Sequence, residues 1–496
     1  MENTLRISAV AHWSGIIIMI LALAVSGCAS HPEMPKPSVP LSAAYQHGED
    51  QPKGDLSADL PWWRQFGDER LVRLVERSAQ ANHNIRIAVE RARQARAGVA
   101  ATESRLFPSV NVTASRSDSR TGLPAVVKQS MPDTKATRAG VDVAWEVDVF
   151  GGARAESSAA EKDAAVAALG VSGAQLITVS EVARQYFVWQ GAAQRLKILE
   201  SLLQTQRDTE RLTRSRNREG MASDFDVARA AGETFSMEAS LPQLRTLMAV
   251  TESRLAVLIG TNASTPVEEL HGAHSFFWNA PTTPFTGQPT DLLRRRPDIL
   301  AAEQRLAAES SRLTQAKANR FPKFFLSALF GTQTLTLNDA LNLSASNYAN
   351  VATAFVLPVF NAGRIQAGID AQSARERESL LAYEQAILGA IEDVENSLVA
   401  LAGERKRAKL LTTAQTQREQ AHAHARSLFR EGQIDLLQLL DVQRAQLATE
   451  LDLAESNTQR AIGYVQLYKA LGGGWQTLPP PANANVAANS SSGVEQ

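Results

Sequence analysis

The sequence of 496 residues has one cysteine, few aromatic side chains and almost no net charge. A single cysteine excludes an internal disulfide framework. The formal charge of -1, from 51 basic and 52 acidic side chains, favours neither a nucleic-acid partner nor a polybasic membrane patch. Because 44% of the residues are hydrophobic and only 6% are aromatic, the composition suits alanine-rich helices packed at close range better than large globular cores.

The cysteine stands directly after a predicted secretion signal. Residues 1–27 contain Arg6 and an apolar run over 16–25, which is too short and too close to the expected cleavage site to span a membrane. Val25–Cys28 resembles the lipobox of bacterial lipoproteins, in which the signal is cut before a cysteine that becomes lipid-modified. The alternative is a chance cysteine after an ordinary signal. Because Ala29 follows rather than an aspartate, the resemblance to lipoproteins favours the outer over the inner membrane.

The rest of the chain contains an internal duplication. Arg218–Phe225 is similar to Arg430–Leu437, which lies 212 positions later. Each half reads as a helix, a Phe-Pro pair, alternating segments, a long helix that begins near glycine and arginine, an Arg-Glu-Gly turn and a second long helix. The predicted organisation is a signal peptide over 1–27, a lipidated tether over 28–60, a first repeat over 61–262, a linker over 263–290, a second repeat over 291–475 and a disordered tail over 476–496.

The alternating segments predict four strands in two hairpins, at about 109–149 and 323–360. Val110, Val112 and Ala114 alternate with polar residues, which is the period of a strand with one apolar face. Such strands suit the wall of a membrane barrel, and the alternative is two half-buried hairpins of a soluble sheet. Four strands cannot close a membrane barrel, because a bilayer tolerates no open sheet edge. A channel would therefore need several chains.

Each repeat is also predicted to contain a long helical hairpin, with tips at about 218–224 and 430–436. A helical run of roughly 60 residues measures roughly 90 Å, far more than a globular domain needs. The stretches 204–218 and 404–426 are polar on nearly every side, as expected where both faces of a hollow helical tube are wet.

Two details of the helices in the first repeat are predicted from local sequence. One helix is expected from Leu71 to about Leu106, where Phe107-Pro108 stops it. The long helix is expected to have a soft break near Gly170 and Gly173.

The start of the second repeat carries a family resemblance. Leu292–Ile299, followed by Phe321-Pro322, closely resembles the motif of TolC-like outer-membrane efflux proteins, and Trp62–Asp68 and Leu467–Gly474 also match. The similarity is closest to the lipoprotein branch that serves pumps of the resistance-nodulation-division type.

The resemblance implies a mixed α and β membrane protein in the outer membrane of a Gram-negative bacterium. Three chains would each give four strands to a twelve-stranded barrel, continued by a helical barrel in the periplasm. The implied partners are two further copies of the chain, a periplasmic adaptor protein and an inner-membrane pump. No enzyme activity and no cofactor is expected, apart from lipid on Cys28. The alternatives left open are a conduit for protein secretion and a periplasmic scaffolding lipoprotein without a pore.

A periplasmic gate is predicted on the helix after the second turn. Leu437, Asp441 and Arg444 are spaced i, i+4 and i+7, so they share one helix face. Taken alone, Asp441 and Arg444 are most simply an exposed ion pair. In the family that the sequence resembles, a leucine, an aspartate and an arginine at this spacing line the periplasmic constriction. Asp435, near the turn, is a weaker candidate for the same ring.

The two turns are the predicted docking sites for the adaptor, again by resemblance. The residues concerned are Arg218, Glu219, Gly220, Arg430, Glu431 and Gly432. Both glycines suit a chain reversal with φ above zero, and the alternative is a plain helix C-cap without a partner.

Histidines do not indicate a metal site. His422 and His424 are two apart on a predicted helix and point about 200° apart, so they cannot share a metal ion. His271 and His274 lie beside the linker without a cysteine or a clear carboxylate partner. No catalytic residues are predicted.

Overall fold

The computed structural model describes residues 34–47, 61–120, 122, 124, 134–271, 286–334 and 347–478. These residues form two compact units. Of the described residues, those within Met1–Pro37, Arg93–Val166 and Ala302–Tyr383 belong to unit 1, and those within Ser38–Ala92, Ala167–Ala301 and Glu384–Gln496 belong to unit 2. Each unit takes segments from both predicted repeats, so a repeat is not a compact unit by itself.

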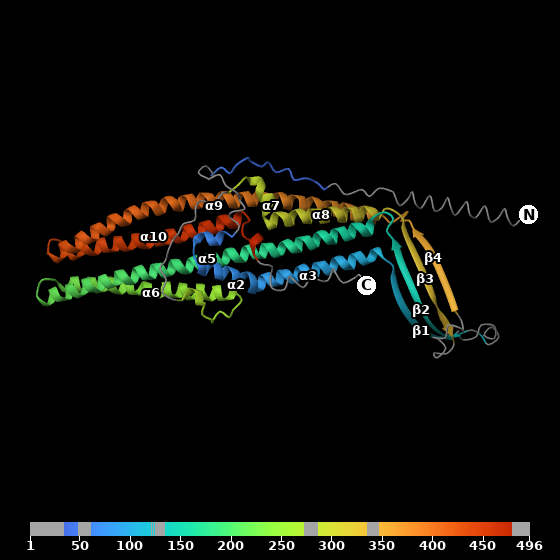
Figure 1. Ribbon diagram of the computed structural model, residues 1–496, viewed down its shortest axis with the longest axis horizontal. Helices are drawn as coiled ribbons and strands as arrows, with labels where there is room; N and C mark the ends of the chain where they lie inside the picture. The colour runs from blue at the N-terminus through green and yellow to red at the C-terminus, as the bar shows by residue number, and fades with distance from the viewer. Residues whose placement is uncertain are drawn as a thin grey trace, which may run out of the picture. The chain divides into compact units, whose positions relative to one another are not determined.

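Unit 1 contains one antiparallel sheet of four strands in the order β1-β2-β3-β4 (Figure 1). The strands are β1 (Ser109–Ser119), β2 (Thr134–Val147), β3 (Lys323–Thr334) and β4 (Asn347–Val356). Both predicted hairpins are present, and β2 joins them by pairing with β3, with Ala144 opposite Ser327. Among the described strands, β1 and β4 pair on one side only.

The register gives the sheet one apolar and one polar face. Two neighbouring rows on the apolar face are Val110, Val143, Ala328 and Val351, and Val112, Val141, Phe330 and Ala349. Two neighbouring rows on the other face are Asn111, Asp142, Leu329 and Asn350, and Thr113, Gly140, Gly331 and Tyr348. Alternation in sequence has therefore become separation in space, because successive side chains of a strand point to opposite faces. The apolar face is open to the surroundings of this chain, and Val112 is 83% exposed.

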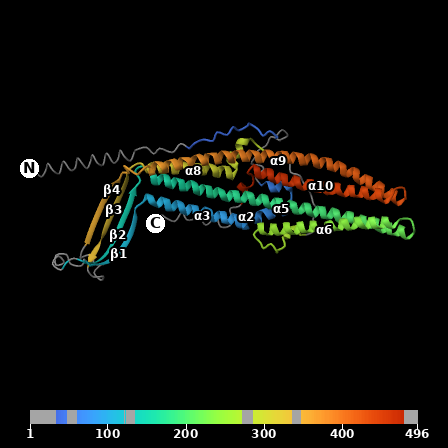
Figure 2. The same ribbon diagram turned by 180° about the vertical axis from the view of Figure 1, so that it is seen from behind.

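Two long helical hairpins follow the strands. They are α5 (Gly152–Arg218) with α6 (Asp224–Leu258), and α9 (Arg364–Arg430) with α10 (Leu436–Ala470) (Figures 1 and 2). Helices α5 and α9 each have 67 residues, α6 and α10 each have 35, and each second-half helix begins 212 residues after its counterpart. The predicted break in α5 is wrong, because α5 continues through Gly170 and Gly173.

The shorter helices are α2 (Glu69–Ala81), α3 (His83–Glu103), α7 (Leu292–Arg295) and α8 (Pro297–Ala318). The prediction of one helix from Leu71 to about Leu106 is wrong, because Asn82 has an extended ψ of 128° and separates α2 from α3. Its side-chain amide donates to the Leu258 carbonyl of α6 at 2.8 Å. This bond satisfies one of the carbonyls that the end of α6 leaves without a helical partner.

Arg296 has the corresponding place before α8, in the arginine-rich motif. Its guanidinium donates to the Ala470 carbonyl of α10 at 3.2 Å and pairs with Asp298 at 2.7 Å and Asp393 at 2.9 Å. Asn82 and Arg296 thus hold the ends of α6 and α10 in the same way, one neutral and one charged.

Aromatic residues from the two ends of the chain pack together in unit 2. Trp62, in the 3-10 helix Trp62–Phe66, stacks on Tyr468 with ring centroids 5.3 Å apart. Phe66 contacts Phe187 of α5 at 4.7 Å between centroids. The motifs near residues 62–68 and 467–474 are therefore parts of one core.

Several predicted segments are described only in part. The signal peptide and Cys28 lie outside the described residues, as do most of the predicted tail and half of the predicted linker. The described part of the tether, residues 34–47, has no regular secondary structure, and its Tyr45 is only 6% exposed. At the other end, Trp475–Thr477 form a short 3-10 helix and Leu478 is buried, so the first positions of the predicted tail are ordered.

Candidate functional site

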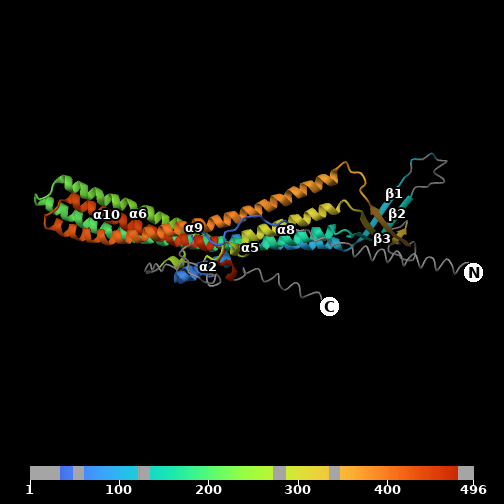
Figure 3. The same cartoon turned by 90° about the horizontal axis from the view of Figure 1, so that it is seen from above.

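The turns between the long helices lie at one end of unit 2 (Figures 1, 2 and 3). Gly220 and Gly432 both have φ of +75°, as predicted from sequence. In the first turn, the Gly220 N–H donates to the Asn217 carbonyl at 2.9 Å and the Met221 N–H to the Arg216 carbonyl at 2.8 Å. The second turn repeats this pattern, which is a Schellman motif that ends a helix at a left-handed glycine.

The helices that leave the turns begin with capping boxes. Ser223 accepts a hydrogen bond from the Asp226 N–H at 3.2 Å, and the Asp226 carboxylate accepts one from the Ser223 N–H at 3.0 Å. Asp435 and Gln438 do the same for α10. Asp435 therefore has a local role as the N-cap of α10, which the prediction of a gate residue did not include.

Arg216 of α5 connects the two turns. One of its guanidinium nitrogens donates to the carbonyls of Phe429 at 2.8 Å and Arg430 at 3.0 Å, and the group lies 4.5 Å from the centre of the Phe429 ring. A cation at the carbonyl end of α9 also interacts favourably with the helix dipole. The equivalent position on α9 is Leu428, so the connection runs in one direction only. No local sequence pattern indicates this contact.

The three predicted gate residues share an exposed face near the start of α10. Leu437 is 41% exposed. Arg444 pairs with Asp441 at 2.9 Å, and its Nε lies 3.4 Å from the Glu233 carboxylate of α6. Beneath them, a small core closes the tips, formed by Ala230, Ala425, Phe429, Leu436, Leu439 and Leu440. Glu233 was not predicted, because the helix period says nothing about the neighbouring hairpin.

All six predicted docking residues at the turns are exposed in this chain. Two apolar side chains of the first turn are exposed beside them, Met221 at 65% and Phe225 at 68%. In the second turn, the Ser427 hydroxyl donates to the Glu431 carboxylate at 3.1 Å. The turns thus present a hydrogen-bonded backbone with polar and apolar groups at the surface.

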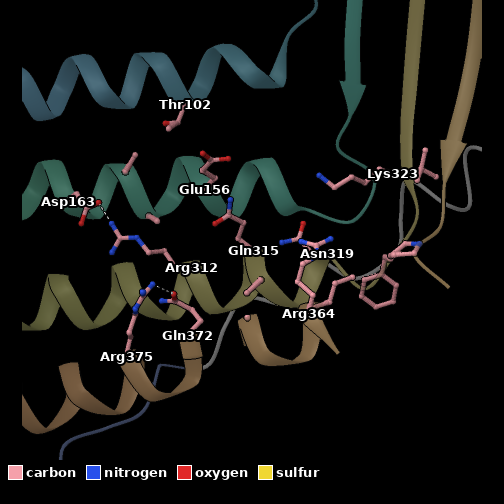
Figure 4. A pocket seen from close by; sticks show the side chains of 18 residues that line it. Thr102, Glu156, Asp163, Arg312, Gln315, Asn319, Lys323, Arg364, Gln372 and Arg375 are labelled. Carbon is pink, nitrogen blue, oxygen red and sulfur yellow. Dashed lines mark hydrogen bonds and ion pairs between the residues drawn. The ribbon is translucent and has the colours of Figure 1, made fainter. Parts of the chain in front are cut away.

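Unit 1 has a hollow of about 780 Å³ where the strands give way to helices (Figure 4). It is bordered by α3, α5, α8, α9 and the ends of β3 and β4. Arg312 pairs with Asp163 across it, and Lys323 pairs with Glu146 at 2.9 Å. Lys323 and Val356 are opposite each other in the register and lie on the polar face of the sheet. The hollow is therefore a charged, water-accessible surface.

Within the described ranges, no group of three or more His, Cys, Asp or Glu side chains could hold a metal ion. His422 is half-buried, and its Nε2 atom has no hydrogen-bond partner among the described residues. Burial, and then Arg426, lower the pKa of His422 below its ordinary value.

A family model described as "Outer membrane efflux protein" matches residues 74–261 and 289–473. The chain belongs to the outer membrane efflux protein family. The TolC-like resemblance seen in the sequence is thereby confirmed. Proteins of this family are channel proteins of the outer membrane, not enzymes.

Known relatives of this chain match over nearly their whole length. It is 28% identical to Nodulation protein T of Rhizobium leguminosarum bv. trifolii, covering 92% of this chain and 97% of the relative. It is 26% identical to Cation efflux system protein CusC of Escherichia coli O6:H1, covering 92% and 98%. The solved structure of the outer-membrane channel OprN superposes with a TM-score of 0.78 at 30% identity, covering 89% of this chain and 99% of OprN.

Proposed function

We propose that the protein is the outer-membrane channel of a tripartite efflux system, which passes small molecules from an inner-membrane pump and a periplasmic adaptor to the outside. The observation that carries the proposal is the four-stranded sheet with an apolar face, a polar face and two outer edges unpaired among the described strands. A sheet of this kind meets lipid with one face and water with the other, and its edges must be paired in a bilayer.

Three copies would give twelve strands and leave no edge. The proposed trimer is supported by the family membership and by the likeness to OprN. In the trimer, the hollow in unit 1 would belong to the water-filled path, because it lies on the polar side of the sheet. Leu437, Asp441 and Arg444 would form a ring around the periplasmic entrance, and the two turns would meet the adaptor. Cys28 would carry the lipid.

Purified protein in a planar lipid bilayer tests this function. We expect single-channel currents of uniform size, and in detergent a mass of three chains. A stable monomer that conducts ions would contradict the trimer. A trimer without conductance would favour the scaffolding lipoprotein.

The identity of the exported compound belongs to the pump rather than to this chain. Relatives are named for different exported compounds, from cation efflux for CusC to pyoverdine export for OpmQ. A conduit for protein secretion is the remaining alternative, and deletion of the gene distinguishes it. Loss of resistance to small toxic compounds with an unchanged set of secreted proteins supports efflux.

A further inference from the structure

Two glycines face each other across neighbouring strands of the sheet in unit 1. Gly140 of β2 is paired with Gly331 of β3, and a Cβ at Gly140 would lie only 2.6 Å from the Phe330 carbonyl oxygen. The two backbones therefore approach each other more closely than a side chain at this position would permit. Since neither residue has a side chain, the pair leaves a gap in the polar face of the sheet.

The side chain of Tyr348 fills this gap. Tyr348 of β4 is paired with Gly331. Its hydroxyl oxygen would lie 2.8 Å from a Cβ at Gly331 and 3.0 Å from a Cβ at Gly140. Because neighbouring strands are roughly 4.8 Å apart, the side chain crosses β3 and reaches roughly 7 Å from its own strand. It therefore lies along the wall of the sheet, in space that two side chains would otherwise take.

Cross-strand pairs occupy the polar face on both sides of the gap. In the neighbouring row toward the helices, the Asn111 amide donates to the Asp142 carboxylate at 3.1 Å. In the neighbouring row away from them, the Arg138 Nε donates to the Gln333 side-chain oxygen at 2.9 Å. The Tyr348 side chain thus lies in a slot that has polar pairs as its sides and the two glycines as its floor.

The slot lies far from the helices of unit 1. β3 begins at Lys323, and Gly331 is eight residues further along, which corresponds to roughly 27 Å of strand. A strand tilted by roughly 40° rises roughly 21 Å over this length, close to the height of the apolar band of a membrane barrel. In the proposed channel, Tyr348 therefore faces water near the outer mouth.

We propose that Tyr348 sets the width of the channel at its outer mouth, and that Gly140 and Gly331 hold its side chain against the wall. The inference rests on the proposed function, because it assumes that the polar face lines a water-filled path. A side chain along the wall takes little of the width. Turned away from the wall, the same side chain extends roughly 7 Å toward the channel axis, and three chains repeat this at one level. Tyr348 thus determines the size of the solutes that pass.

Polymer exclusion in a planar lipid bilayer tests this role. Polyethylene glycol of graded mass, added on the side of the outer mouth, lowers the single-channel current only when it enters. In Gly331→Ala the added methyl group displaces the tyrosine hydroxyl, so we expect the largest polymer that enters to be smaller by roughly twofold or more in mass. Tyr348→Ala in the same protein should restore the wild-type limit. Ala352→Val is the control, because Ala352 lies on the polar face of β4, opposite Ser327 and away from the slot.

A second pair of variants leaves both glycines in place. Tyr348→Trp is too large for the slot and is expected to lower the polymer limit, whereas Tyr348→Phe fits and should keep it. The mass in detergent shows which variants assemble, and Tyr348→Trp decides the question if Gly331→Ala does not. A wild-type polymer limit in assembled Gly331→Ala or Tyr348→Trp protein would overturn the proposal.

The wild type separates this inference from the proposed function. Wild-type currents together with an unchanged polymer limit in the variants disprove the role of Tyr348 and leave the channel intact. Wild-type trimers without current disprove the channel itself, and with it the water-filled path that Tyr348 is proposed to narrow.

Discussion

Near the start of α10, Asp441 and Arg444 form an exposed ion pair to which Glu233 of α6 adds a second carboxylate. Exposed pairs of this kind contribute about 0.2 to 1 kcal/mol, so their loss hardly changes the stability of the hairpin. Threefold repetition around an entrance would give them a larger effect on ions, because rings of charge control which ions pass.

We therefore expect Arg444→Ala and Asp441→Ala to raise single-channel conductance, with trimer mass unchanged and the free energy of unfolding changed by less than about 1 kcal/mol. Asp452→Ala is the control, because Asp452 lies three turns further along the same face and pairs with Arg407 at 3.6 Å. Wild-type conductance in both tip variants, across salt concentrations, would move the constriction to another part of the chain.

His422 is expected to make the second hairpin sensitive to acid. Its pKa is lowered by burial and by Arg426, so the folded state favours the neutral ring. That contribution to stability is complete above the ordinary pKa of 6.5 and is lost as the pH falls below it. Glu450, which accepts from Gln446 at 2.7 Å, acts in the opposite direction, because burial raises its pKa.

The variant His422→Gln removes the titratable ring. We expect the free energy of unfolding of this variant, measured by thermal unfolding, to fall less than that of the wild type between neutral pH and pH values below 6.5. His424→Gln, at an exposed position two residues later, serves as control and should follow the wild type. Identical pH profiles for His422→Gln and the wild type would show that the ring is not held neutral.

At the scale of elements, each of the four long helices is followed by a glycine in the same left-handed backbone conformation. Gly220, Gly432, Gly260 and Gly472 have φ between 68° and 77°, but their surroundings differ. A Cβ at Gly220 or Gly432 would meet nothing within 4 Å. At Gly260 it would lie 2.6 Å from the Ala81 carbonyl oxygen.

Gly432→Ala is therefore expected to cost about 1 to 2 kcal/mol, the strain of a left-handed alanine alone. Gly260→Ala should cost clearly more, because the backbone of residue 81 must also move. Native-state hydrogen exchange of the Gln433 and Thr261 amides, which close the two motifs, measures the difference. Equal destabilisation by the two substitutions would contradict the role assigned to the Ala81 contact.

The elements were largely predictable from sequence, whereas their contacts were not. Periods of two and 3.6 residues predicted the strands and the long helices, and glycine predicted both turns, since these features depend on neighbours in sequence. The break at Asn82, the capping of α9 by Arg216 and the pairing of Arg444 with Glu233 depend on segments far apart in sequence. No local pattern contains that information. The gate face was predicted, but its second carboxylate was not.

At the scale of the whole molecule, the proposed anchor decides where the protein is found. Acyl chains contribute about 0.8 kcal/mol for each buried methylene. We expect Cys28→Ser to abolish labelling with radioactive palmitate and to reduce the amount of trimer in the outer-membrane fraction. Equal label on wild type and variant would exclude Cys28 as the modified residue, and unchanged recovery would show that the strands alone place the protein.

The equal lengths of the two hairpins have an evolutionary consequence. When two duplicated helices keep the same length, a side chain can change in one copy without altering the helical register of the remaining residues. The second half has used this freedom: it has Glu384 and Glu395 where the first half has Ser172 and Ala183. A chimera built from two second halves would keep the two hairpins and would have two further carboxylates on its first long helix, at the positions of Ser172 and Ala183. Divergence after duplication has thus left two hairpins of equal length with different side chains at corresponding positions of their first helices.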